Sequence, residues 1–265
     1  MTALFDFLYD QPILLVRVLV GVSLVAFALG GLAIARRFVL PRLRMTEDDA
    51  GFSGAMVQAV LIFYGLVVTL IAVNTWQNYS DVSGAVSNEA GAIVVMYRNV
   101  SGYPEPIRTQ ARSELREYVG YIIHDAWPLQ HKGIMPSGGV DLIDKLQTTL
   151  FSFEPTTEGQ KLLHAATINA YDALIVSRLT RLDAVVGGLP GLLWMVVIMG
   201  SVVSLISTFF FRVEDARLHG TLVVLLAVFI SLVVVMIFAF DRPFRGDLGL
   251  QPTSYQLIYD DLMAR

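Results

Sequence analysis

A stripe of amide and carboxylate side chains follows the second long apolar segment of the chain. Asn74, Asn78, Asp81 and Asn88 recur at a spacing close to 3.5 residues, which keeps them on one face of a helix. Amide side chains can line a water-filled path without holding ions tightly, and a ring of carboxylates favours cations. The alternative is an ordinary solvated face of a surface helix. These residues are pore-lining candidates if several copies of the chain surround an axis.

The residue types that most often carry catalysis or metal binding show no comparable pattern. Cysteine is absent, which excludes disulfides, thiol nucleophiles and thiolate metal ligands. The four histidines lack metal-ligand spacing, and the chain contains no phosphate-binding loop and no hydrolase or metalloprotease motif. We therefore expect no enzyme, no metal site and no bound cofactor. The net charge of −4, without a basic tail, also gives no sign of nucleic-acid binding.

The composition indicates an integral membrane protein. Of the 265 residues, 55% are hydrophobic and 16% are charged, which is too apolar for a soluble domain of this size. Crossing a bilayer takes about 20 apolar residues. Four segments are long enough, namely residues 13–35, 53–73, 190–211 and roughly 220–240. The lipid bilayer is thus the first expected partner.

Arg17 is the one formal charge inside these four segments. Charged residues within a membrane are costly and often functional. Arg17 is also only four residues from the start of its segment, where an arginine can extend to the membrane surface. Both interpretations stay open, with Asp10 and Asp241 as possible partners at the same membrane face.

The arginines near the four segments predict the orientation of the chain. Residues 36–52 contain four arginines and residues 212–219 contain two, and both short segments lie on the same side of the membrane. Positive residues collect on the cytoplasmic side, so we expect both termini and residues 77–189 outside the cytoplasm. Arg242 and Arg245, directly after the last span, argue against this orientation.

Residues 77–189 carry the signals of a helical bundle of about four elements. Pro104 and Pro106 can start one helix, and Thr157 with Gln160 forms a capping-box pattern at the start of another. The predicted fold class is an all-α membrane protein, in which four transmembrane helices carry a helical extramembrane bundle between the second and the third.

Two further predictions concern the segments that flank this bundle. No proline lies between Pro41 and Pro104, so the second span is expected to continue as one helix from about residue 53 to about residue 100. Prolines and glycines at 128–139 predict a loop, followed by a short helix near 140–151. Apolar residues at helical spacing predict the buried face of the last helix as Ile168, Tyr171, Ile175, Leu179, Leu182 and Val186.

The predicted domain organisation follows from these segments. Residues 1–76 contain the first two membrane helices and a short cytoplasmic loop, and residues 77–189 form the helical insert. Residues 190–240 contain the last two membrane helices, and residues 241–265 form a C-terminal tail.

Several charged residues of the insert have more than one interpretation. Glu89, next to the polar stripe, can be a buried partner of Arg98 or Arg112, although an exposed carboxylate is the interpretation that the sequence favours. Arg108, Arg112 and Arg116 stand at i, i+4 and i+8, with glutamates on the same helix. This pattern favours a salt-bridged surface over a site that gathers anions.

The residues that follow the fourth span are Asp241-Arg242-Pro243-Phe244-Arg245-Gly246-Asp247. Their Pro-Phe-x-Gly-Asp element resembles the Pro-Phe-Gly-acidic segment after the last membrane helix of bestrophin anion channels. The chain as a whole looks more like the uncharacterised bacterial bestrophin-like family, over nearly its full length. Further marks of that family are Ala50-Gly51-Phe52, Trp76, Glu89-Ala90, Tyr97-Arg98, Pro104-x-Pro106, Trp127-Pro128, Leu189-Pro190, Leu193-Trp194 and Phe211-x-Val213-Glu214.

The resemblance implies a homo-oligomer, by analogy a pentamer, with a central pore for inorganic ions in the bacterial inner membrane. It favours anions over cations. In bestrophins the acidic cluster after the motif helps to bind calcium, but this chain keeps only Asp247 there, with Asp241 before it, so we infer no calcium site. The soluble part of bestrophins is cytoplasmic, whereas the arginines of this chain place the insert outside.

Two alternatives remain beside the channel. The motif after the fourth span can be a purely structural turn, in which Pro243 ends a helix, Gly246 permits a turn and Phe244 tucks back at the membrane surface. The whole protein can be a non-conducting membrane scaffold or envelope sensor that binds a partner through its helical insert.

Overall fold

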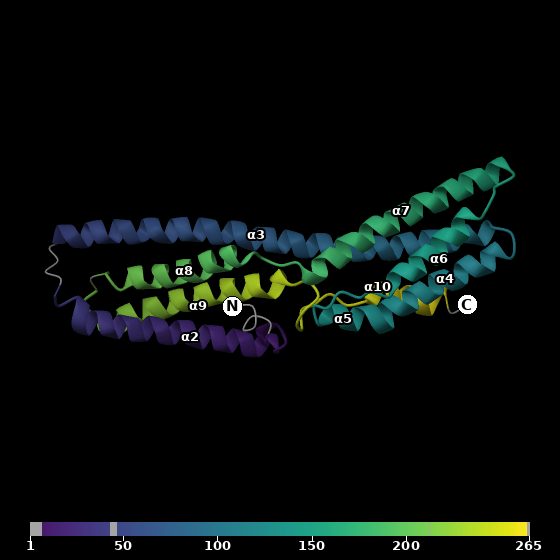
Figure 1. Ribbon diagram of the computed structural model, residues 1–265. Coiled ribbons are helices and arrows are strands. Elements are labelled where there is room, and N and C mark those ends of the chain that lie inside the picture. Colours follow the sequence, from purple (N-terminus) through teal and green to yellow (C-terminus); the bar gives the residue numbers. More distant parts are fainter. Residues whose placement is uncertain (1–6, 43–46, 212, 264–265) are drawn as a thin grey trace. The chain divides into compact units, whose positions relative to one another are not determined.

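The described part of the chain, residues 7–42, 47–211 and 213–263 of a computed structural model, is helical (Figure 1). Within these residues no strand is present, which confirms the all-α fold class. Four shorter helical turns follow or extend the main helices, namely η1 (Ala35–Val39), η2 (Val100–Gly102), η3 (Ile122–Ala126) and η4 (Ile258–Leu262). The main helices are α2 (Ile13–Ile34), α3 (Glu47–Asn99), α4 (Ile107–Tyr121), α5 (Trp127–His131), α6 (Gly139–Phe151), α7 (Glu158–Val186), α8 (Gly191–Thr208), α9 (Ala216–Asp241) and α10 (Thr253–Leu257).

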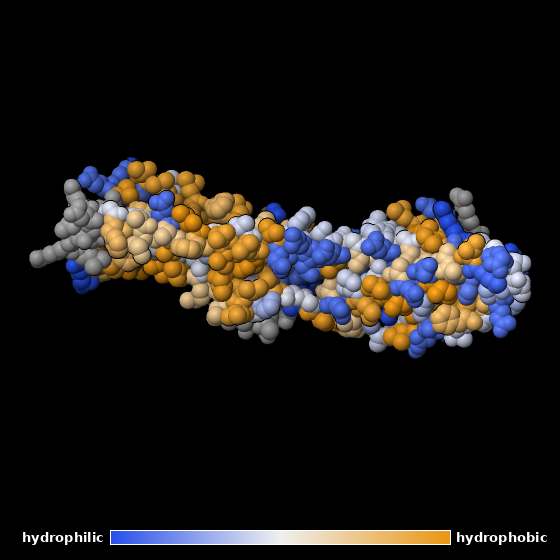
Figure 2. Space-filling view, turned by 90° about the horizontal axis from the view of Figure 1, so that it is seen from above, coloured by the Kyte–Doolittle hydropathy of each residue, from blue (hydrophilic) through white to orange (hydrophobic). Residues whose placement is uncertain are grey.

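The chain divides into two compact units. The first, here called the span unit, comprises residues 1–77 and 189–241, and the second, here called the insert unit, comprises residues 78–188 and 242–265. The C-terminal residues after α9 therefore belong with the insert unit. The face seen in the space-filling view carries mostly apolar residues over one part and a mixture of polar and apolar residues over the rest (Figure 2).

Four helical segments of the described chain are long and apolar enough to cross a membrane. They are Ile13–Val39, Gly51–Gly102, Gly191–Thr208 and Ala216–Asp241, which confirms the four predicted spans. Pro12 and Pro190 stand directly before α2 and α8, where a missing N–H removes no helical hydrogen bond. Inside the span unit, α2, α8 and α9 share a buried cluster of Ala28, Leu32, Ala35, Leu205, Phe209, Val223, Ala227 and Ile230.

The contact between α3 and α8 depends on small residues. The Tyr64 hydroxyl of α3 lies 2.7 Å from the Ser201 hydroxyl and 3.2 Å from the carbonyl oxygen of Val197. A Cβ atom on Gly200 would lie 2.4 Å from the Tyr64 ring, so only glycine permits this approach. Small and hydroxyl-bearing residues pack membrane helices together in this way.

The helix α3 confirms the predicted continuous helix. It runs from Glu47 to Asn99 without a break, because no residue in this stretch lacks a backbone N–H. The division between the two units falls inside it, at residues 77 and 78.

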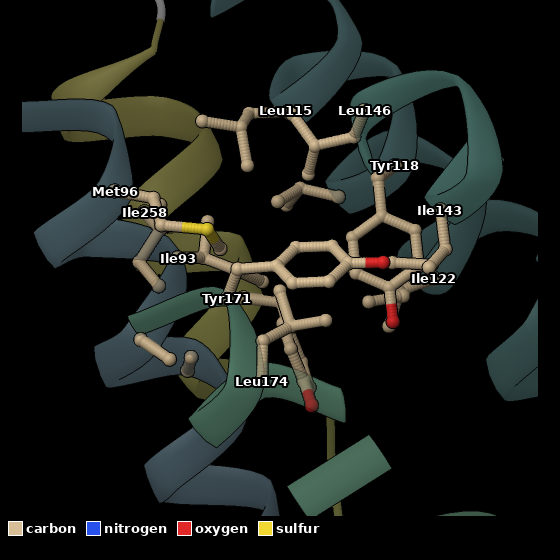
Figure 3. Packing of buried hydrophobic residues seen from close by; sticks show 14 of the residues in the cluster. Ile93, Met96, Leu115, Tyr118, Ile122, Ile143, Leu146, Tyr171, Leu174 and Ile258 are labelled. Atoms are coloured by element: carbon tan, nitrogen blue, oxygen red, sulfur yellow. The ribbon is translucent and has the colours of Figure 1, made fainter. Parts of the chain in front are cut away.

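The insert unit has one apolar core, to which α3, α4, α6, α7 and the C-terminal turns all contribute (Figure 3). The predicted helices near Pro104–Pro106, at 140–151 and after Thr157 are present as α4, α6 and α7. At the start of α7 the Thr157 hydroxyl accepts from the Gln160 N–H, and Gln160 accepts from the Thr157 N–H in return. The core residues labelled in Figure 3 are Ile93, Met96, Leu115, Tyr118, Ile122, Ile143, Leu146, Tyr171, Leu174 and Ile258.

Two local predictions were wrong. Pro128 lies in the first turn of α5 and not in a loop, since the first turn is where a helix tolerates proline. On α7, Leu179 and Val186 are more than half exposed, whereas Ser177 and Arg181 are buried. The apolar pattern missed this rotation because the buried face includes polar residues, among them Arg181, whose partner Glu89 lies on α3.

Candidate functional site

The polar stripe lies along α3, and its four candidate residues are exposed in the single chain. Asn74, Asn78, Asp81 and Asn88 all present their side chains to the surroundings. The neighbouring apolar stripe of Val82, Val86, Ala90 and Ile93 is buried, as expected. One face of α3 therefore packs into the core while the amide-bearing face remains free to contact water or another copy of the chain.

Beside this stripe, Glu89 sits at the centre of a buried polar cluster. Its carboxylate accepts from Arg181 Nε at 2.6 Å and from Arg181 Nη2 at 3.0 Å. The Tyr118 hydroxyl donates to Oε1 at 2.6 Å, and the Tyr255 hydroxyl donates to Oε2 at 3.0 Å. The four side chains are between 0% and 2% exposed. The cluster thus joins α3, α4, α7 and α10 through one carboxylate.

The surroundings shift the pKa values of the cluster's partners. Burial, followed by the negative charge of Glu89, raises the pKa values of Tyr118 and Tyr255 well above 10. Burial is the largest single influence on Arg181 and lowers its pKa, but the Glu89 carboxylate and the two tyrosines together raise the pKa of Arg181 above its usual value. Both tyrosines therefore stay protonated and act as hydrogen-bond donors, while Arg181 stays charged.

The prediction of an exposed carboxylate at position 89 is therefore wrong, and so is the pairing of Glu89 with Arg98 or Arg112. Glu89 is fully buried and pairs with Arg181, which lies 92 residues away in sequence. Arg112 instead donates to the Ser101 hydroxyl at 2.5 Å and lies over the Tyr97 ring. No local pattern marks Arg181 as the partner, because the pairing depends on how α7 packs against α3.

The three arginines of α4 form a less regular surface than expected. Arg108 pairs with Glu105 at 2.6 Å, and both side chains are a little under half exposed. Arg116 lies over the Tyr259 ring at 5.3 Å, and Arg112 stacks on Tyr97. Within the described chain only Arg108 of the three is in a salt bridge, so aromatic rings take the place of the expected acidic partners.

The first residue of the motif, Asp241, is the last residue of α9 and of the span unit. Asp241 is buried, and its carboxylate accepts from the Tyr9 hydroxyl, the Leu189 N–H and, at 3.1 Å, Trp194 Nε1. These donors are all neutral. Asp241, one of the two possible partners named for Arg17, does not pair with it, because uncharged groups from three other segments donate to both carboxylate oxygens.

The remaining motif residues build a turn in the insert unit. Arg242 donates to the carbonyl oxygen of Val186 at 3.0 Å, at the end of α7. Phe244 is buried and meets the Trp127 ring edge-on, with the ring centroids 5.4 Å apart. Gly246 has a φ of 74°, a conformation that favours glycine, and Leu250 N–H donates to the Pro243 carbonyl at 2.8 Å. Phe244 thus packs into the insert unit's core.

The other candidate residues of the span unit are exposed. Arg17 projects from α2 and makes no hydrogen bond or salt bridge to any other residue that the structure describes. Trp76 is about half exposed, and its ring meets Phe240 edge-on at 5.0 Å.

Comparisons with known proteins agree with this architecture. Residues 22–255 match the family described as Bestrophin-like domain. Among solved structures, the chain is similar to a variant of a bacterial bestrophin homolog from Klebsiella pneumoniae, with a TM-score of 0.62 and 12% sequence identity over 94% of this chain and 98% of the other. At this identity the likeness concerns the fold alone. No curated protein matches the sequence.

Proposed function

The chain belongs to the Bestrophin-like domain family, and we propose that it forms a homo-oligomeric ion channel in the bacterial inner membrane. The family match over residues 22–255 carries the proposal. The four apolar helices make it a multi-pass membrane protein, and its fold is similar to that of a bacterial bestrophin homolog. By analogy with bestrophins the oligomer is a pentamer.

The part of the chain that would face the pore is α3. Its exposed Asn74, Asn78, Asp81 and Asn88 give it a polar face that no described residue covers. Amides both donate and accept hydrogen bonds, so a ring of them can hydrate passing ions of either sign. The family resemblance favours inorganic anions, whereas a ring of Asp81 carboxylates favours cations. Asp81 is therefore the residue at which selectivity is tested.

The purified protein in liposomes should conduct, and the reversal potential under a salt gradient reports its selectivity. Asp81→Lys should shift the reversal potential toward anions, and Asn78→Asp should shift it toward cations, because each changes the sign or number of charges that a passing ion meets. Asp172→Lys, an equal charge change at an exposed position of α7, is the matched control. Identical reversal potentials in wild type and the three variants would show that this stripe does not line the pore.

A specific observation favours the second candidate, a scaffold or sensor that binds a partner. On α7 of the insert unit, Leu162, Val176 and Leu179 are 74%, 64% and 52% exposed. Exposed apolar residues along one helix often mark a contact surface. A reproducible current from the purified protein alone would count against a purely structural role.

We further propose that the insert unit and both termini lie outside the cytoplasm. The support is the concentration of arginines in residues 36–52 and 212–219. Calcium binding is not part of the proposal, because the motif lacks consecutive acids after Gly246.

A further inference from the structure

A pocket of the span unit has features that neither the stripe nor the motif uses. It has a volume of about 300 Å³. Its apolar wall comes from α3, from α9 and from the segment between α8 and α9, and consists of Leu61, Phe211, Val213, Leu222, Val223 and Leu226. Along α9 it extends from His219 to Leu226, about 10 Å of helix at 1.5 Å per residue. The pocket is therefore a slot that begins at the end of α8 and continues among apolar residues.

A network of hydrogen bonds closes the polar end of this slot. His219 is buried, and its Nε2 lies 3.1 Å from the carbonyl oxygen of Thr208, so Nε2 carries the proton and donates. Its Nδ1 lies 3.5 Å from Arg36 Nη1 and accepts. Arg36 also donates to the carbonyl oxygens of Val213 and Glu214, each at 3.2 Å. These bonds hold the Arg36 guanidinium against Val213 and His219, two residues that line the slot.

Arg36 has donors left for a ligand. A guanidinium carries five N–H groups, and Arg36 uses three of them for Val213, Glu214 and His219. The other two have no partner among the residues that the structure describes, and the side chain is partly exposed. Arg37 follows directly and is exposed. The Arg37 guanidinium lies over the Phe38 ring, 5.7 Å from its centroid. The paired N–H groups of a guanidinium match the geometry of a phosphate group, so the free N–H groups of Arg36 can hold one.

The surroundings decide what occupies the slot. The slot lies among helices that cross the membrane, and Leu222 at its edge is about half exposed. The apolar part of the slot is therefore open to the acyl chains of lipids. Basic groups beside pockets between membrane helices bind the headgroups of anionic lipids. We propose that the slot binds one acyl chain of an anionic phospholipid whose phosphate is held at Arg36, while the exposed Arg37 adds positive charge at the same membrane surface. The proposal depends on membrane insertion and not on conduction.

The test measures lipid retained by the full-length protein. The chain is purified from detergent micelles that contain equal amounts of phosphatidylglycerol and phosphatidylcholine, and bound lipid is counted by native mass spectrometry. Wild-type protein should retain phosphatidylglycerol in excess. Leu222→Trp should fill the slot and abolish retention, while Leu225→Trp, an exposed position on the same helix that does not line the slot, should not.

A charge variant tests the headgroup part of the proposal. Arg37→Gln should lower the preference for the anionic lipid about fivefold, the worth of one arginine at a membrane surface. Arg42→Gln, another exposed arginine of the same short segment, should change it less. Equal retention of both lipids by wild type, or equal loss in Leu222→Trp and Leu225→Trp, would overturn the proposal. A changed oligomer size in Leu222→Trp with unchanged lipid would also overturn it, and would assign the slot to a contact between copies.

Discussion

At the scale of single residues, Glu89 has the largest structural role that the sequence conceals. Its carboxylate accepts four hydrogen bonds from Arg181, Tyr118 and Tyr255. A buried ion pair is not by itself a source of stability, because removing two charges from water is expensive. Removing one partner alone, however, leaves an uncompensated charge in the core.

Glu89→Ala should therefore destabilise the protein strongly, by about 3–5 kcal/mol, because Arg181 would remain buried without its counter-ion. A thermal unfolding curve of the detergent-purified protein measures this. The neighbouring Asn88→Ala, at an exposed position, should change the stability by no more than about 0.5 kcal/mol. Equal melting temperatures of the two variants would contradict the assignment of Glu89 to the core.

The two tyrosines predict how stability depends on pH. Their folded-state pKa values are raised above the ordinary value by burial and by Glu89, so the folded state holds these protons to higher pH than the unfolded state. The stabilising contribution is complete below the unfolded-state pKa of about 10 and is lost as the pH rises beyond it. Melting temperatures measured across this range should fall less steeply for Tyr118→Phe than for wild type. Parallel curves would show that Tyr118 does not contribute.

At the scale of elements, the turn after α9 has two different reasons for its glycines. Gly246 needs glycine for its φ of 74°. Gly249 is packed so closely that a Cβ atom would lie 2.6 Å from the carbonyl oxygen of Phe244. Since that atom belongs to the backbone, no side-chain rotation relieves the contact. The turn holds Leu250 where its carbonyl oxygen accepts from Trp127 Nε1 at 3.0 Å.

Gly249→Ala should consequently lower the free energy of unfolding by about 1–3 kcal/mol, an amount typical of overpacking. The melting temperature should fall with it. Gly159→Ala in the first turn of α7 is the control, because a Cβ atom there meets nothing within 4 Å, and alanine favours a helix by up to about 1 kcal/mol over glycine. If Gly249→Ala melted at or above the temperature of Gly159→Ala, the turn would not be tightly constrained.

For the whole molecule, the arginine distribution and the analogy with bestrophins predict opposite sides of the membrane for the insert unit. Arg36, one of the arginines that predict the orientation, also holds the segment between α8 and α9 by two hydrogen bonds to carbonyl oxygens. A structural role and an orienting role are compatible, because both need the charge at the end of α2.

The absence of cysteine in the chain makes orientation directly measurable. A cysteine at the exposed position Ser113 of the insert unit should react with a membrane-impermeant maleimide in intact spheroplasts. A cysteine at the exposed position Ala216, at the start of α9, should react only after the membrane is permeabilised. The reverse pattern would place the insert unit in the cytoplasm, as in bestrophins.

Features that depend on neighbouring residues were predictable from the sequence. The four spans follow from local apolarity, the unbroken α3 from the absence of proline, the start of α7 from Thr157 and Gln160, and the turn after α9 from Gly246. The exposed amides of α3 were also apparent from spacing alone. Each of these depends on contacts within a few residues, which a single sequence records.

Which distant side chains meet was not predictable from the sequence and became apparent from the packing of the helices. This packing buried Glu89 against Arg181, turned α7 so that Leu179 faces outward, and surrounded Asp241 with neutral donors in place of Arg17. All three have the same cause. The partner of a buried polar group is set by how helices far apart in the chain pack together, and the free energy of that packing is shared among many residues rather than encoded in a local pattern.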